Sequence, residues 1–240
     1  MKRILPLAAL LLLAGLMPAA AQELTLDLGE GGSLAARSVQ LLLLITVLSV
    51  VPGLAIMVTC FPFIVTVLSI LRQGIGLQQA PPNMLIITLA MFLTWFVMDP
   101  VFTEAWTRGI GPFTEGALDI PTAFHEAAEP FRRFMSARMD PDTFARLDAL
   151  RPREPTPIPE APLSVLVPSF LLSEIQRAFE IGFLVYLPFL IIDLVVSAIL
   201  MSMGMMMVPP AVVSLPFKLA FFVVADGWSL LAAALVRSYT

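Results

Sequence analysis

The sequence predicts an all-α membrane protein in which two kinked helical hairpins flank a polar helical segment. Hydrophobic residues make up 58% of the 240-residue chain and charged residues 13%, against about 45–50% and about 25% in soluble domains. The charges are also unevenly placed, because Arg72 and Asp99 are the only ones between residues 38 and 103. An apolar block, a polar block and a second apolar block therefore follow one another along the chain, as expected for membrane helices on either side of an aqueous segment.

The composition excludes several classes of protein. With 14 Lys and Arg and 18 Asp and Glu, the chain has too few charges to cover a soluble secreted enzyme or to remain disordered. Its net charge of −4 excludes a nucleic-acid binder, which needs a basic face. Its single cysteine excludes an internal disulfide and a thiolate zinc site.

Candidate catalytic and metal-binding residues are few. His125 and Glu129 have the spacing of one helical turn, but two ligands do not complete a zinc site. We interpret them as a solvated helix face. Cys60 lies in an apolar run with no base nearby in the sequence. The sequence therefore predicts no cofactor, no metal site and no enzymatic activity.

Residues 1–21 have the order of a secretory signal peptide. Lys2 and Arg3 precede a Leu-rich apolar run, and small residues follow Pro18 up to Ala21. This order predicts cleavage after Ala21. An uncleaved membrane anchor is the alternative. Residues 22–38 are then a polar, mobile lead.

Residues 39–107 are predicted to form the first hairpin. Residues 41–71 carry no charge but contain Pro52 and Pro62, so bends are expected near both prolines. Glycines at 74 and 76 end this segment. A second apolar run, residues 84–98, is expected to close at Asp99 and Pro100. At 15 residues it would be only about 23 Å long, short of the ~30 Å hydrocarbon core.

Residues 108–162 are predicted to form a polar helical segment that ends in a Pro-rich linker. Helical spacing runs from residue 121 to 139, and Phe131, Phe134 and Met135 share one face. Asp140 followed by Pro141 predicts the start of a short helix that ends near residue 150. Residues 151–162 contain five prolines and predict an extended linker.

Residues 163–240 are predicted to form the second hairpin, and their charged residues are unusual in so apolar a stretch. Charge facing lipid is unfavourable, so these side chains should face protein or water. Glu174, Arg177 and Glu180 can form a ladder along one helix face. We predict an ionic pair between Glu174 and Lys218, across a hairpin or subunit boundary. Static pairing within an assembly and a polar path for a translocated substrate both remain open. The expected buried ionic contacts are Glu174, Arg177, Asp193, Lys218 and Asp226.

The run Met-Ser-Met-Gly-Met-Met-Met at residues 201–207 is the other unusual feature. Methionine is unbranched and polarizable, and it adapts to irregular shapes. The run is either a flexible core filler or a deformable apolar ring that closes a pore against ions by excluding water.

Several long stretches resemble one family, the FliP/SctR export-gate family of flagellar and virulence type III secretion systems. The resemblance covers roughly residues 39–236 apart from the Pro-rich linker. The stretches that carry it are residues 71–79, 81–83, 170–175, 178–183, 188–196, 201–207, 214–219 and 226–228. The signal peptide and the large polar block favour the flagellar branch. The chain departs from the family at Pro62 and Phe63, where Thr-Arg is usual.

The resemblance implies a core subunit of a protein-export gate in the bacterial inner membrane, with much of the chain at the periplasmic level of the basal body. It implies assembly with other copies of the chain, as a pentamer, and with FliQ- and FliR-like subunits into a helical pore complex. FlhA/FlhB-like components, unfolded export substrates and membrane lipid are the further implied partners. By this resemblance the pore gasket is formed by Met205, Met206 and Met207. A small-solute transporter or channel, and a membrane scaffold without a pore, are the alternatives.

Overall fold

The computed structural model describes residues 34–76, 81–152, 156–205 and 207–239. These residues form helices, with no strand among them. The predicted signal peptide, its cleavage site after Ala21 and most of the predicted polar lead lie outside the described residues. The chain divides into two units, Met1–Leu48 and Ser49–Thr240. In the first unit, the described residues belong to helix α2 (Leu34–Met57), and the side chains of residues 41–46 are exposed.

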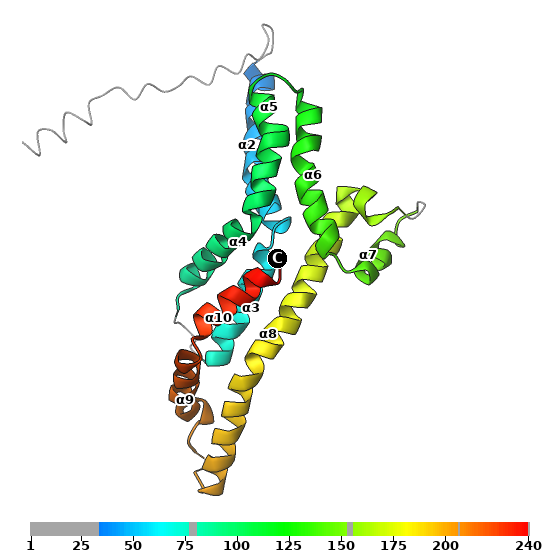
Figure 1. Ribbon diagram of the computed structural model, residues 1–240. Coiled ribbons are helices and arrows are strands. Elements are labelled where there is room, and N and C mark those ends of the chain that lie inside the picture. Colours follow the sequence, from blue (N-terminus) through cyan, green and yellow to red (C-terminus); the bar gives the residue numbers. More distant parts are fainter. Residues whose placement is uncertain (1–33, 77–80, 153–155, 206, 240) are drawn as a thin grey trace, which may run out of the picture. The chain divides into compact units, whose positions relative to one another are not determined.

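The second unit contains the remaining helices (Figure 1). They are α3 (Phe61–Ile75), α4 (Asn83–Ala105), the π-helix η1 (Trp106–Ile110), α5 (Gly111–Thr114), α6 (Ile120–Arg138), α7 (Pro141–Asp148), the short 3₁₀ helix η2 (Ile158–Glu160), α8 (Leu163–Ser202), α9 (Pro210–Val224) and α10 (Gly227–Arg237).

Helix α3 lies at the centre of this unit, where it packs chiefly against α8 and also against α4. Pro62 occupies its first turn, where the missing N–H is no loss, and Gly76 ends it with a left-handed φ of 87°. The expected break near Pro62 is confirmed, whereas Pro52 lies inside α2. One face of α3 is buried along its whole length, through Phe63, Ile64, Val67, Leu68, Leu71 and Ile75. Each such side chain contributes about 1.5–3 kcal/mol by leaving water.

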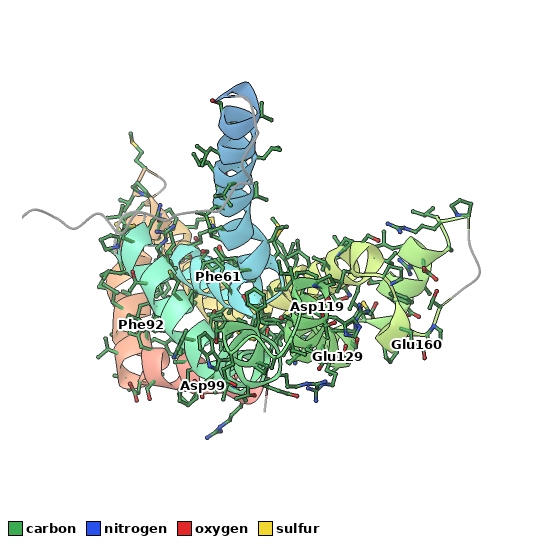
Figure 2. All side chains as sticks on the ribbon, turned by 90° about the horizontal axis from the view of Figure 1, so that it is seen from above. Phe61, Phe92, Asp99, Asp119, Glu129 and Glu160 are labelled. Carbon is green, nitrogen blue, oxygen red and sulfur yellow. The ribbon has the colours of Figure 1, made fainter. Side chains whose placement is uncertain are left out.

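Helix α4 is longer than the sequence predicted. The expected stop at Asp99 and Pro100 is wrong, because α4 continues through Pro100 to Ala105 and then into η1 and α5. A proline inside a helix removes one hydrogen bond but does not always end the helix. Phe92 is 70% exposed and Asp99 is also exposed (Figure 2). The continuous run Asn83–Thr114 is long and apolar enough to cross a membrane.

The polar block folds largely as predicted. Residues 120–138 form the single helix α6, and α7 follows at Pro141. The Asp140 carboxylate accepts a hydrogen bond from the Thr143 backbone N–H at 2.8 Å, which confirms the predicted cap of α7. Ser173 on α8 accepts a hydrogen bond from the Asp140 N–H at 3.0 Å. Helix α7 is therefore fixed to α8 through the residue that caps its start.

Helix α8 runs for 40 residues and includes Pro168 and Pro188. It is the second helix with the length and apolar character of a membrane span. Helices α9 and α10 are bent by 61° at a short break, and they qualify as a span only when taken together, as does the pair formed by residues 41–57 and α3. The described residues thus hold two to four candidate spans, which confirms an all-helical chain with membrane-capable helices.

Candidate functional site

Glu174 forms the centre of a buried ionic site. Its side chain is 0% exposed and lies on α8. Arg138 at the end of α6 approaches with its Nε 3.3 Å from Glu174 Oε1, and Arg177 Nη1 lies 3.7 Å from the same oxygen. The hydroxyl of Tyr239 donates a hydrogen bond to Glu174 Oε2. Both carboxylate oxygens therefore have partners, as a buried anion requires.

Tyr239 is held on several sides by groups from three helices. Its ring stacks on Phe134 of α6, with centroids 5.9 Å apart and an interplanar angle of 15°. Phe63 of α3 meets it edge-on at 5.5 Å, and the Arg138 guanidinium carbon lies 4.0 Å from its centroid. Burial, together with the neighbouring Glu174 carboxylate, raises the pKa of Tyr239 above its ordinary value. At neutral pH the phenol therefore stays protonated and donates to Glu174.

Sequence reasoning did not identify Arg138 or Tyr239 as parts of this site. Arg138 lies 36 positions before Glu174 in the polar block, and Tyr239 lies 65 positions after it. No local spacing connects residues so far apart. Phe63, where the family resemblance predicts Arg, is 0% exposed and contacts the Tyr239 ring.

Lys218 forms a second ionic site between α9, α8 and the end of α3. Its Nζ lies 2.6 Å from Asp193 Oδ2 and donates a hydrogen bond to the Gly74 carbonyl at 3.0 Å. The Ser214 hydroxyl donates to Asp193 Oδ1 at 2.5 Å. Gly74 lies in the last turn of α3, where carbonyl groups lack helical partners and favour a cation. Lys218 thus neutralises Asp193 and satisfies the end of α3 at once.

The predicted pair of Glu174 with Lys218 does not form within the described chain. Each side chain has a different partner there, since Lys218 contacts Asp193 and Glu174 contacts Arg138. Glu174 and Asp193 are 19 positions apart on α8, or roughly 28 Å at the rise of an α-helix. One lysine cannot reach both carboxylates.

The predicted charge ladder on α8 forms only in part. Arg177 contacts Glu174, but Glu180 is exposed and accepts a hydrogen bond from Gln176 at 3.2 Å instead. Asp226 is exposed at the start of α10, where its φ is 48°. It therefore marks a sharp turn between α9 and α10 rather than a buried contact within this chain.

The methionine run lies where α8 turns towards α9. Met205 is 37% exposed and Met207 is 97% exposed, whereas Met206 lies outside the described residues. Gly204 has a φ of 72°, which allows the chain to leave α8 sharply. Met201 and Met203 are also exposed, at 62% and 64%. The described methionines of this run, Met201, Met203, Met205 and Met207, thus lie on the surface of the isolated chain and not in its core.

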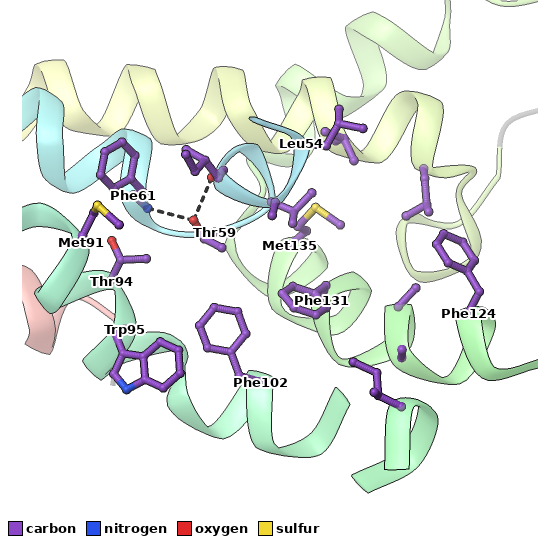
Figure 3. A pocket seen from close by; sticks show the side chains of 18 residues that line it. Leu54, Thr59, Phe61, Met91, Thr94, Trp95, Phe102, Phe124, Phe131 and Met135 are labelled. Atoms are coloured by element: carbon purple, nitrogen blue, oxygen red, sulfur yellow. Dashed lines mark hydrogen bonds between the residues drawn. The ribbon is translucent and has the colours of Figure 1, made fainter. Parts of the chain in front are cut away.

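An apolar cavity of about 770 Å³ lies between the end of α2, α4, α6 and the start of α8 (Figure 3). Trp95 and Phe102 of α4 and Phe131 of α6 line it. Thr59 contributes little polarity, because its hydroxyl already donates to the Ile56 carbonyl at 2.8 Å. Such a lining suits an apolar helix or an acyl chain.

The structure places the residues considered for chemistry, His125 and Cys60, in different surroundings. His125 is exposed, and its ring lies 3.9 Å from Glu126, its neighbour in sequence. Cys60 is fully buried. Within the described ranges, no group of three or more His, Cys, Asp or Glu side chains is arranged to hold a metal ion.

The helices and the two buried ionic sites define a membrane protein whose charged side chains are neutralised by contacts between helices. Comparison with known proteins gives its family. The family model of the FliP family matches residues 44–235, and the chain belongs to that family. It is 50% identical over 230 residues to the flagellar biosynthetic protein FliP of Caulobacter vibrioides, which covers 93% of this chain and 86% of the relative.

Two further relatives carry the same name. The flagellar biosynthetic protein FliP of Agrobacterium fabrum is 49% identical over 239 residues, covering 97% of each chain. That of Bacillus subtilis is 44% identical over 203 residues, covering 84% of this chain and 92% of the relative. The similarity therefore extends over both apolar blocks and the polar block between them.

Proposed function

We propose that this chain is a core subunit of the flagellar type III protein export gate and helps to form the pore through which unfolded proteins pass. In this proposal several copies, five by family resemblance, assemble with FliQ- and FliR-like subunits in the bacterial inner membrane. FlhA/FlhB-like export components, unfolded substrates and membrane lipid are the further partners in this proposal. Much of the chain lies at the periplasmic level of the basal body, and the chain performs no chemical step.

The exposed apolar face of α8 supports an assembled state. Phe179, Phe183 and Leu184 are 61%, 57% and 63% exposed, and Leu194 further along the helix is 61% exposed. Apolar patches of this extent are not stable in water and need lipid or protein to cover them. In a multi-subunit gate, neighbouring helices cover part of this face and lipid covers the rest.

The single observation that carries the pore role is the exposed methionine turn. Met205 and Met207 project from the junction of α8 and α9 without being used in the core. When several copies are arranged around an axis, such turns form a ring of flexible thioethers. An apolar constriction blocks ions by excluding water, and flexible side chains can part for a passing chain.

The test is to replace Met205, Met206 and Met207 together with Ala. We expect the complex to assemble but the membrane to leak small ions, because the apolar constriction is widened. Conductance of cells or of reconstituted vesicles measures the leak. The matched control replaces Met84 and Met91, which are 72% and 58% exposed on α4, and should stay tight.

The other outcomes separate this proposal from its rivals. If the triple variant fails to assemble and shows no leak, the methionines have a structural role in the core. A variant that assembles and stays tight would place the seal elsewhere and favour a scaffold without a pore. A small-solute transporter predicts saturable solute uptake by the chain alone and a binding site between repeated halves. The mass of the detergent-purified complex, co-expressed with neighbouring membrane subunits, gives the number of copies.

A further inference from the structure

The two described residues that follow α10, Ser238 and Tyr239, are called the tail segment, and their contacts are unlike those of α10 itself. Within α10 only Leu231 and Leu235 are buried. The tail segment, in contrast, enters the Glu174 site, and Figure 1 shows the end of α10 turned back among the other helices. The tail segment therefore adds polar and aromatic contacts to the apolar ones that α10 makes itself through Leu231 and Leu235.

The tail segment is bound through both main-chain and side-chain groups. Arg138 Nη1 donates a hydrogen bond to the Ser238 carbonyl, while the Tyr239 hydroxyl donates to Glu174. The aromatic contacts with Phe63 and Phe134 complete the site. Arg138 thus binds the tail segment and the Glu174 carboxylate at the same time, so the phenol and the charges stabilise one another.

The junction before α10 provides a position for bending. Asp226 has a φ of 48°, and the axes of α9 and α10 differ by 61° there. Helix α9 has its own attachment to α8, through Lys218 and Ser214 to Asp193. Release of the tail segment would therefore loosen α10 and leave α9 in place.

We propose that the tail segment is a clamp that fastens α10 to the core formed by α3, α6 and α8, and that α10 swings about Asp226 when Tyr239 is released. The proposal concerns motion within one chain and does not depend on the export-gate function. Tyr239 is then a positioning residue, and Arg138 and Glu174 are the groups that bind it.

Hydrogen exchange of the full chain, purified in detergent with its co-purifying subunits, tests the clamp. Tyr239→Phe removes the hydroxyl and keeps the ring, so exchange of the α10 amides should rise roughly tenfold, as expected for loss of a hydrogen bond to a charged group. Tyr239→Ala should raise it further, on the order of 100-fold, since the stacking contacts are lost as well. Peptides from α3, α7 and α9 should change less than twofold.

Tyr186→Phe is the matched control, because Tyr186 on α8 is the only other tyrosine in the chain. It should leave α10 exchange unchanged. If exchange rises equally in α3, α9 and α10, Tyr239 is an ordinary core residue and the clamp is wrong. If α10 exchange stays at its original rate in Tyr239→Phe, the hydroxyl does not hold it. Should Tyr239→Ala fail to fold, the Tyr239→Phe result decides alone.

Discussion

The Glu174 and Lys218 sites both neutralise charge inside an apolar helical protein, yet they differ in depth and in the number of partners. The Glu174 side chain is 0% exposed and receives two arginines and a phenol. The Lys218 side chain is 6% exposed, and its partner Asp193 is 30% exposed. Of the two carboxylates, only that of Glu174 is fully shielded from water.

This difference has an energetic consequence. A fully buried carboxylate needs hydrogen-bond donors or positive charge at its oxygens, and the Glu174 site obtains them from distant parts of the chain. Asp193 is 30% exposed, so water can solvate its carboxylate and it needs fewer partners within the protein. The Glu174 site should therefore lose more stability than the Lys218 site on a single substitution.

The largest effect is expected for Glu174→Ala. It leaves Arg138 and Arg177 without their common partner and removes the acceptor of Tyr239, so we expect a loss of about 3–5 kcal/mol in unfolding free energy. Unfolding of the detergent-purified chain, followed by circular dichroism, provides the measurement. Glu180→Ala, at an exposed position of the same helix, is the control and should change stability by less than about 0.5 kcal/mol. Equal losses of stability in Glu174→Ala and Glu180→Ala would show that burial of the carboxylate makes no difference.

Lys218→Met should have an intermediate effect. Methionine keeps the apolar stem of the side chain but loses the contacts with Asp193 and the Gly74 carbonyl. Because Asp193 is 30% exposed and can take up water, we expect a loss of about 1–3 kcal/mol. The same unfolding measurement applies. Adding Asp193→Asn should recover part of the loss, since no unpaired charge then remains. A loss greater than that of Glu174→Ala would reverse the order proposed here.

Asp140 extends the comparison to a carboxylate with neutral partners. Hydrogen bonds from the Thr143 hydroxyl and backbone N–H hold the pKa of Asp140 below its usual range. Its stabilisation is therefore complete above about pH 4, and it is lost as the pH falls through the lowered pKa of the folded state. Asp140→Ala should reduce stability less than Lys218→Met does. It should also weaken the dependence of the unfolding midpoint on pH between 2 and 5. If the unfolding midpoint of Asp140→Ala depends on pH between 2 and 5 as strongly as that of the unaltered chain, the cap contributes nothing to stability.

The smallest effect concerns the coupling of the two sites. Glu174 and Asp193 are roughly 28 Å apart along α8, and independent sites at such distances add within about 0.5 kcal/mol. We therefore expect the double variant Glu174→Gln, Asp193→Asn to lose the sum of the two single losses. A double-mutant cycle in the unfolding assay measures the coupling. A coupling above 1 kcal/mol would mean that α8 transmits strain between the sites.

The sequence by itself determined the helical class, the membrane-capable segments and several helix ends. These properties depend on composition and on residues close together in the chain. Gly76 ends α3 because a left-handed residue is needed there, and Asp140 caps α7 through a residue three positions away. The need of Glu174 and Lys218 for partners was also predictable, because an isolated charge in an apolar helix is unstable.

Only the tertiary structure decided which partners these charges have. Attraction between opposite charges carries no information about position along the chain, so Glu174 had equally plausible partners in Lys218 and in any arginine of the polar block. The packing of α3 against α8, and of α6 beside them, brings Arg138 and Tyr239 to Glu174 and leaves Lys218 with Asp193. Likewise Pro100 could end α4 or lie within it, and the helix continues to Ala105. The physical reason is that partner choice and helix continuation depend on contacts between residues far apart in sequence, which local patterns do not specify.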